Sequence, residues 1–222
     1  MTKKVIVFDF DETLGSFSQL YQFWYFIKMF FDNNLTDEHF YSILDDNILF
    51  FRPNILNIFN ILKYKKQKKI CSHVIIYTNN NAPFFWVELI KNYLNKKMNY
   101  IVIDQIIRAY KIDNKIVECC RNTNEKTLDD FINCTKLSKN TKICFFDDKI
   151  HNNMIHKNVL YINLEPYVFN EKINILIKKF YISNLSLFKT CKKNYNVFFH
   201  FVAVSLTATK PEDVSCASIG SS

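Results

Sequence analysis

Two aspartates near the N-terminus have the types and the spacing that phosphoryl transfer requires. Asp9 and Asp11 stand two residues apart, directly after the apolar run 5–8, and Thr13 follows them. One carboxylate can attack phosphorus as a nucleophile, while the other delivers and removes protons. This pattern of Asp, Asp and Thr occurs by chance at roughly one position in ten thousand. The motif therefore needs support from the elements that would position it.

Five short runs rich in β-branched and aromatic residues are typical of buried strands. They span residues 5–8, 73–77, 100–103, 142–146 and 159–162. Helical patterns at 53–69, 86–95, 125–134 and 171–181 alternate with the later runs. This alternation predicts an α/β fold with a central parallel five-stranded sheet and helices on both faces. In such folds, ligands bind at the carboxyl ends of the strands.

Polar residues follow two more of the predicted strands. Thr78 ends the second run, Asp147 and Asp148 end the fourth, and Lys126 begins the helical pattern before that fourth run. Thr78 could also be an ordinary turn residue, because three asparagines follow it. Lys126 competes with Lys136, Lys139 and Lys142, and we prefer it because a helix N-terminus near the strand ends can face a phosphate.

The ordered set of these residues resembles the four motifs of the haloacid dehalogenase (HAD) superfamily. The segments FDFDETL and ICFFDDKIH are most similar to its branch of RNA polymerase II C-terminal-domain phosphatases, which includes the NLI-interacting-factor-like group. The resemblance covers roughly residues 4–164. It implies a HAD-type Rossmann-like fold. The residues favoured by A+T-rich codons fit a large DNA virus or a protist as the source, and the resemblance to viral members of the branch favours the virus.

The resemblance also implies catalytic roles. Asp9 would be the nucleophile that forms an aspartyl-phosphate, and Asp11 would be the general acid and base. Thr78 would donate a hydrogen bond to the transferring phosphoryl group. Lys126 would neutralise the negative charge around it.

A magnesium site is implied by the same resemblance. Asp9, Asp147, Asp148 and the backbone carbonyl of Asp11 would bind Mg²⁺, a hard cation that prefers oxygen ligands. The second residue of the acidic pair is often Asn in this branch, so which of Asp147 and Asp148 contacts the metal stays open.

Three further residues are candidates for substrate binding. They are Thr13, Asn79 and Arg121, although Arg121 could equally be an ordinary exposed arginine. The acidic pair Asp129 and Asp130 falls within a helical pattern, where we expect solvated surface charges.

These residues predict a Mg²⁺-dependent phosphomonoester hydrolase, with a phosphorylated protein or small molecule as substrate and phosphoserine or phosphothreonine as a specific expectation. The alternatives are a nucleic-acid 3′-end phosphatase and a catalytically silent scaffold that binds phosphorylated partners. The net charge of +8 favours anionic partners, but the lysines are scattered, so we attribute it to composition. Gly15 and Gly220 are the only glycines, which excludes a P-loop.

The chain divides by composition near residue 196. Residues 1–196 are predicted to form the phosphatase domain, and residues 17–50 a small helical cap-like insertion of two aromatic-rich helices separated near 32–34. Residues 107–118 predict a hairpin. Residues 197–222 lack Asn and hold three of the five alanines, which indicates an atypical, partly disordered and dispensable tail.

The cysteines and the apolar runs bear on location. Seven cysteines without regular spacing argue against a disulfide framework and favour a reducing compartment. No run reaches the roughly 18 apolar residues of a membrane span, and the N-terminal apolar run meets Asp9 too early for a signal peptide. We therefore expect a cytoplasmic protein, in the host cytoplasm if viral, without membrane contact.

Overall fold

The computed structural model describes residues 4–208, which belong to two compact units. One unit is built from residues 4–15 and 52–168, and the other from residues 16–51 and 169–208. The first unit contains every predicted site residue.

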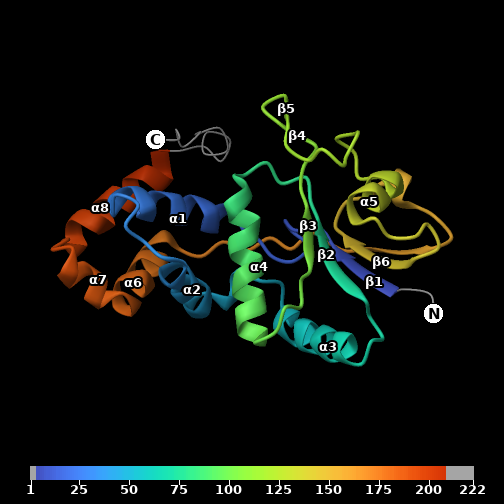
Figure 1. Ribbon diagram of the computed structural model, residues 1–222. Helices are drawn as coiled ribbons and strands as arrows, with labels where there is room; N and C mark the ends of the chain where they lie inside the picture. The colour runs from blue at the N-terminus through green and yellow to red at the C-terminus, as the bar shows by residue number, and fades with distance from the viewer. Residues whose placement is uncertain (1–3, 209–222) are drawn as a thin grey trace. The chain divides into compact units, whose positions relative to one another are not determined.

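A five-stranded parallel sheet forms the centre of the first unit (Figure 1). Its order is β3-β2-β1-β6-β7, which confirms the predicted α/β fold with a central parallel sheet. The strands are β1 (Lys4–Phe8), β2 (His73–Tyr77), β3 (Gln105–Ile107), β6 (Lys142–Asp147) and β7 (Val159–Asn163).

The third strand lies later in the chain than predicted. The apolar run 100–103 is not a strand, and the ladder to β2 begins at Gln105. The Asn95 side chain accepts hydrogen bonds from the backbone N–H groups of Val102 and Ile103, at 2.9 and 3.0 Å. Val102 and Ile103 are fully buried. A side chain thus satisfies the backbone groups that a strand would otherwise pair, so burial alone explains the apolar run.

Helices cover both faces of the sheet because successive side chains of a strand point to opposite faces. On one face, Val7 and Phe145 share a buried cluster with Phe131 of α5 (Leu128–Thr135). On the other face, the ring of Phe8 stacks on Phe59 of α3 (Ile55–Gln67), with centroids 5.9 Å apart. Helix α4 (Phe84–Met98) packs against α3. The predicted helices at 53–69, 86–95 and 125–134 are therefore present, with shifted ends.

The predicted hairpin is confirmed by β4 (Lys111–Ile112) and β5 (Lys115–Ile116), which pair antiparallel. Asp113 and Asn114 form the turn with φ angles of 50° and 61°. This left-handed region suits Asp and Asn, whose short polar side chains tolerate it, so the turn needs no glycine.

The second unit joins two segments that are distant in the sequence. Buried rings of Phe31, Phe180, Phe188 and Phe198 contact one another, with centroids 5.0 to 6.4 Å apart. The two predicted helices at 17–50 are present, but they share this core with the C-terminal helices rather than forming an insertion of their own. The elements are α1 (Ser18–Phe30), α2 (Asp37–Asp46), η1 (Ile48–Phe50), α6 (Ile173–Ser183), α7 (Leu185–Thr190) and α8 (Tyr195–Ala208).

The predicted tail begins inside α8. Phe198 and Val202 have no exposed surface, and α8 packs against α1 and α6. The change of composition after residue 196 therefore does not mark the end of folded structure, and residues 197–208 belong to the second unit. Residues 209–222 lie outside the described residues, so the prediction for them stays a prediction. Within residues 4–208, no helix combines the length and the apolar character that crossing a bilayer requires.

Candidate active site

The loop after β1 places two aspartates at the carboxyl edge of the sheet. The N–H of Asp9 donates to the carbonyl of Phe146 at 2.8 Å, and the chain then turns tightly, with Glu12 at a φ of 58°. Phe10 and Leu14 are fully buried and anchor the turn. Asp9 is buried and Asp11 is half-buried.

Lys126 forms a buried ion-paired cluster with two of the predicted carboxylates. Its ammonium donates hydrogen bonds to Oδ1 of Asp9 and to Oδ2 of Asp147, the latter at 2.7 Å. The side chains of Lys126, Asp9 and Asp147 are only 3, 10 and 1% exposed. The structure thus brings together three residues that lie as many as 138 positions apart, because β1 and β6 are neighbours.

The competing lysines lie elsewhere. The Lys139 side chain is 83% exposed, and Lys142 at the start of β6 bonds the side-chain oxygen of Asn158 at 2.6 Å. Lys136 follows the last turn of α5. Lys126 itself stands two residues before α5, whose N-cap is Thr127.

Three carboxylates could hold a metal ion. Asp9, Asp147 and Asp148 each offer one oxygen, and these oxygens lie within 4.8 Å of one another. Asp148 is fixed by Thr13, whose hydroxyl donates to Oδ1 of Asp148 and accepts from its N–H, both at 3.1 Å. The N–H of Lys149 donates to Oδ1 of Asp147 at 2.8 Å.

The chemistry of this donor set fits Mg²⁺. Its members are all hard oxygen atoms, and Lys126 can neutralise only one of three negative charges. Burial raises the pKa of Asp9 to about 7, with Asp147 adding to the increase and Lys126 opposing it. A divalent cation would compensate the remaining charge, and both members of the acidic pair could contact it.

Asp11 does not belong to the group of three carboxylates, and its carboxylate accepts a hydrogen bond from the Asn80 amide at 2.7 Å. Burial raises the pKa of Asp11 to about 6, although the Asn80 hydrogen bond and Lys126 oppose this increase. Thr78 is buried, and its hydroxyl accepts from the Asn80 N–H at 2.9 Å. The hydrogen bond from Asn80 to Thr78 thus places the Asn80 side chain beside Asp11.

Two predicted substrate-binding residues have other partners. Thr13 is buried and holds Asp148, as described above. The Arg121 side chain has no exposed surface and donates to carbonyls of the protein, so a role in substrate binding stays a prediction. Asn79 is exposed, and its Oδ1 accepts from Arg121 at 2.9 Å.

Asp130 was expected to be a solvated surface charge, but it is buried. It stands in the first turn of α5, where its carboxylate accepts from the N–H groups of Asn122 and Thr123, at 3.0 and 3.3 Å. Acidic residues are favoured in the first turn of a helix, but Asp129 shares this turn and its side chain is 83% exposed, so the pattern does not single out Asp130.

Two further residues escaped the sequence analysis. Nε2 of His151 lies 3.5 Å from Oδ2 of Asp147, and burial lowers the pKa of His151, with Lys126 adding to the decrease. Arg52 donates hydrogen bonds to the carbonyls of Glu12, Thr13 and Glu165, at 2.6 to 2.7 Å. Arg52 therefore ties the loop after β1 to the segment after β7.

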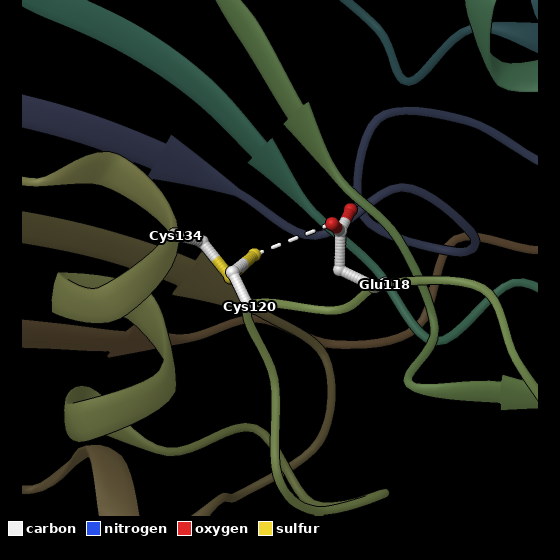
Figure 2. Close-up of side chains that lie close together, drawn as sticks. All are labelled: Glu118, Cys120 and Cys134. Carbon is white, nitrogen blue, oxygen red and sulfur yellow. Dashed lines mark hydrogen bonds between the residues drawn. A yellow bond between two sulfur atoms is a disulfide. The ribbon is translucent and has the colours of Figure 1, made fainter.

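A disulfide joins Cys120 to Cys134, which the sequence analysis did not pair (Figure 2). The fold brings these residues together because the segment before Lys126 lies against α5. Oε1 of Glu118 lies 3.3 Å from Sγ of Cys120, although a bonded sulfur has no proton to donate. Both sulfurs are used in the covalent bond, so this group offers no thiolate to a metal. Cys71, Cys119, Cys144 and Cys191 are free.

No protein-family model, curated protein or solved structure matches this chain. The class therefore follows from the structure itself, an α/β fold with a five-stranded all-parallel sheet flanked by helices. Its site is a cluster of carboxylates and one lysine at the carboxyl edge of that sheet.

Proposed function

We propose that this protein is a Mg²⁺-dependent phosphomonoester hydrolase of the HAD type, which acts through an aspartyl-phosphate. The observation that carries the proposal is the buried contact of Lys126 with Asp9 and Asp147, with Asp11 two residues from Asp9. The sequence resemblance to HAD phosphatases supports the same assignment.

The concentration of buried charge also supports a catalytic site. Within residues 4–208, the buried ionisable residues with charged side chains are Asp9, Arg121, Lys126, Asp130 and Asp147. All five belong to this cluster or to the segment that carries Lys126. Burying charge is costly, so a fold that concentrates this cost in one place indicates function more than stability.

In the first step, a carboxylate oxygen of Asp9 attacks phosphorus and the bond from phosphorus to the ester oxygen breaks. Asp11 transfers its proton to the departing oxygen, so an alcohol leaves and an aspartyl-phosphate remains. Asn80 holds the Asp11 carboxyl through the 2.7 Å hydrogen bond. Lys126 offsets negative charge on the phosphoryl oxygens during the transfer.

In the second step, Asp11 removes a proton from water while the water oxygen attacks phosphorus. The bond between phosphorus and Asp9 breaks, which releases inorganic phosphate and restores both carboxyl groups. Thr78 lies at the neighbouring strand end, where its hydroxyl could donate to the phosphoryl group.

Asp9, Asp147 and Asp148 would hold Mg²⁺, and the Asp11 carbonyl is the further ligand that the resemblance implies. When bound, this cation would compensate the negative charge of the carboxylates and the phosphate. Thr13 and Lys149 keep the two aspartates at the carboxyl end of β6 in place through their hydrogen bonds.

The test is hydrolysis of an aryl phosphate and of phosphoserine and phosphothreonine peptides, with and without Mg²⁺. Asp9→Asn should lower kcat at least about a thousandfold, because it removes the nucleophile. The matched control is Asp129→Asn, since the Asp129 side chain is 83% exposed and pairs loosely with Lys139. This control should keep the wild-type rate.

An Asp9→Asn variant that hydrolyses phosphate at the wild-type rate would refute the mechanism. Beryllofluoride, which mimics a phosphoryl group on an aspartate, should form an adduct at Asp9 of the wild type. A wild type that binds phosphopeptides but neither hydrolyses them nor accepts beryllofluoride would be a scaffold, not an enzyme.

A further inference from the structure

The Arg121 guanidinium links three segments at the carboxyl edge of the sheet. It is fully buried and donates to five acceptor atoms, at distances from 2.6 to 3.3 Å. The acceptors are the carbonyls of Thr78, Arg108, Asn124 and Glu125 and Oδ1 of Asn79. These positions follow β2, follow β3 and directly precede Lys126.

Both neighbours of Lys126 are held at the backbone. Nη2 of Arg121 donates to the Glu125 carbonyl at 2.9 Å. On the other side, the Tyr77 hydroxyl accepts from the Thr127 N–H at 3.1 Å and contacts the Thr127 carbonyl at 3.4 Å. The two side chains that hold these neighbours, Arg121 and Tyr77, also contact each other: the Arg121 guanidinium carbon lies 4.9 Å from the centre of the Tyr77 ring.

The lysine needs this support because its side chain is a flexible four-carbon stem. Its ammonium must stay between Asp9 and Asp147, and a shift of the backbone at residues 125–127 would move it out of hydrogen-bond reach. Residues 122–125 are themselves exposed, so they lack a buried face to hold them. The buried contacts of Arg121, together with those of Asp130, replace that missing packing.

We propose that Arg121 is a positioning residue, which sets Lys126 against the Asp9–Asp147 pair and also fixes the strand end that carries Thr78. This inference rests on the proposed function for its catalytic consequence, although the positioning can be tested without catalysis. Arginine suits the role because its planar fork carries five donors, whereas a lysine at this position would offer one nitrogen.

The experiment measures how fast an amine-acylating reagent modifies each lysine, by mass spectrometry of peptides from the folded protein. In the wild type, Lys126 should react slowly because it is buried and ion-paired, and Lys139 should react fast. In Arg121→Gln, acylation of Lys126 should become about tenfold faster or more, the size expected from losing hydrogen bonds to a charged group. Lys66, 7% exposed and bonded to Asp104, is the internal reference and should not change.

Arg108→Gln is the matched control. The Arg108 side chain contacts Glu118, the Val117 carbonyl and the Phe84 ring, none of which touches Lys126. The substitution should leave Lys126 acylation within about twofold of the wild type, since it keeps the Arg108 carbonyl that accepts from Arg121 and removes only the side-chain contacts. Tyr77→Phe is the second variant, to be used if Arg121→Gln fails to fold. It removes a single oxygen, the one that holds Thr127, and should also accelerate Lys126 acylation.

The same variants are then assayed for phosphatase activity. Arg121→Gln should lower kcat about tenfold or more while cooperative thermal unfolding is retained. Unchanged Lys126 acylation in the folded variants would overturn the positioning role. Faster acylation in a protein whose wild type hydrolyses no phosphomonoester would support the positioning role and reject the proposed function.

Discussion

Replacing Lys126 with methionine should destabilise the first unit strongly, and more at high pH than at low pH. Methionine has nearly the same volume as lysine and fills the same space without the charge. The substitution leaves Asp9 and Asp147 buried together, at 10 and 1% exposure, with no hydrogen bond from an ammonium. Breaking a buried ion pair in this way costs about 3–5 kcal/mol.

The pH dependence follows from the carboxyl groups that remain. Lys126 already opposes the increase in the Asp9 pKa, which stands at about 7. Without Lys126, the pKa of Asp9 must rise further. A carboxyl whose pKa is higher in the folded state stabilises the fold below its unfolded pKa of 3.8, and this contribution is lost as pH rises through the folded pKa. The penalty of Lys126→Met should therefore be smaller at pH 5, below the Asp9 pKa of both proteins, than at pH 8.

The assay is unfolding by urea, followed by circular dichroism in a metal chelator at pH 5 and pH 8. Lys66→Met is the control, because Lys66 also forms a short ion pair, at 2.6 Å, but its partner Asp104 is 27% exposed. That carboxylate can be hydrated, so the control should cost less and depend little on pH in this range. Adding Asp9→Asn to Lys126→Met should restore a large part of the lost stability.

A Lys126→Met penalty that is equal at pH 5 and pH 8 would contradict this role of Lys126. A double variant that is no more stable than the single one would contradict it as well. Either result would mean that the Asp9 and Asp147 carboxylates do not depend on Lys126 as their counter-charge.

Two further predictions concern covalent and aromatic contacts. Cys134→Ser should lower the free energy of unfolding by about 3 kcal/mol, because the Cys120–Cys134 bond spans 14 residues. Unfolding with and without a reductant measures this loss. An effect no larger than that of Cys191→Ser would contradict the prediction. Deleting residues 195–222 should make the second unit sensitive to proteolysis, because Phe198 of α8 is completely buried in its core. Deletion of residues 209–222 is the control. Equal resistance of both products to the protease would restore the expectation that the segment from residue 197 is dispensable.

The sequence predicted the sheet well because its signals are local. Each of β1, β2, β6 and β7 is a short run of β-branched or aromatic residues, and a polar residue stands at or directly after the strand end. Parallel pairing then forces Asp9 and Asp147 to the same edge, whatever the length of chain between them. Lys126 could be chosen among several lysines by its place before a helix at that edge.

The sequence could not show which apolar runs pair with a neighbouring strand in the sheet. The run 100–103 has the composition of a strand, yet Asn95 satisfies its backbone and the ladder starts two residues later. The second unit was hidden for a similar reason. Phe31 and Phe198 contact each other across 167 positions, and nothing in either local pattern indicates the partner. Aromatic residues are usually buried, but this tendency does not predict which residues they contact.

The partners of buried charged residues are the hardest to predict from the sequence. Arg121 and Asp130 are of types that are usually exposed, so a sequence assigns them to the surface or to a ligand. Their burial depends on carbonyls and N–H groups that loops leave without partners at residues 122–125. The net charge of +8 is equally uninformative about the site, because exposed lysines are screened by salt and water whereas Lys126 is not. The charge that matters at this site is the local one, in which the Asp9 and Asp147 carboxylates share a single buried ammonium, and only a fold can reveal that balance.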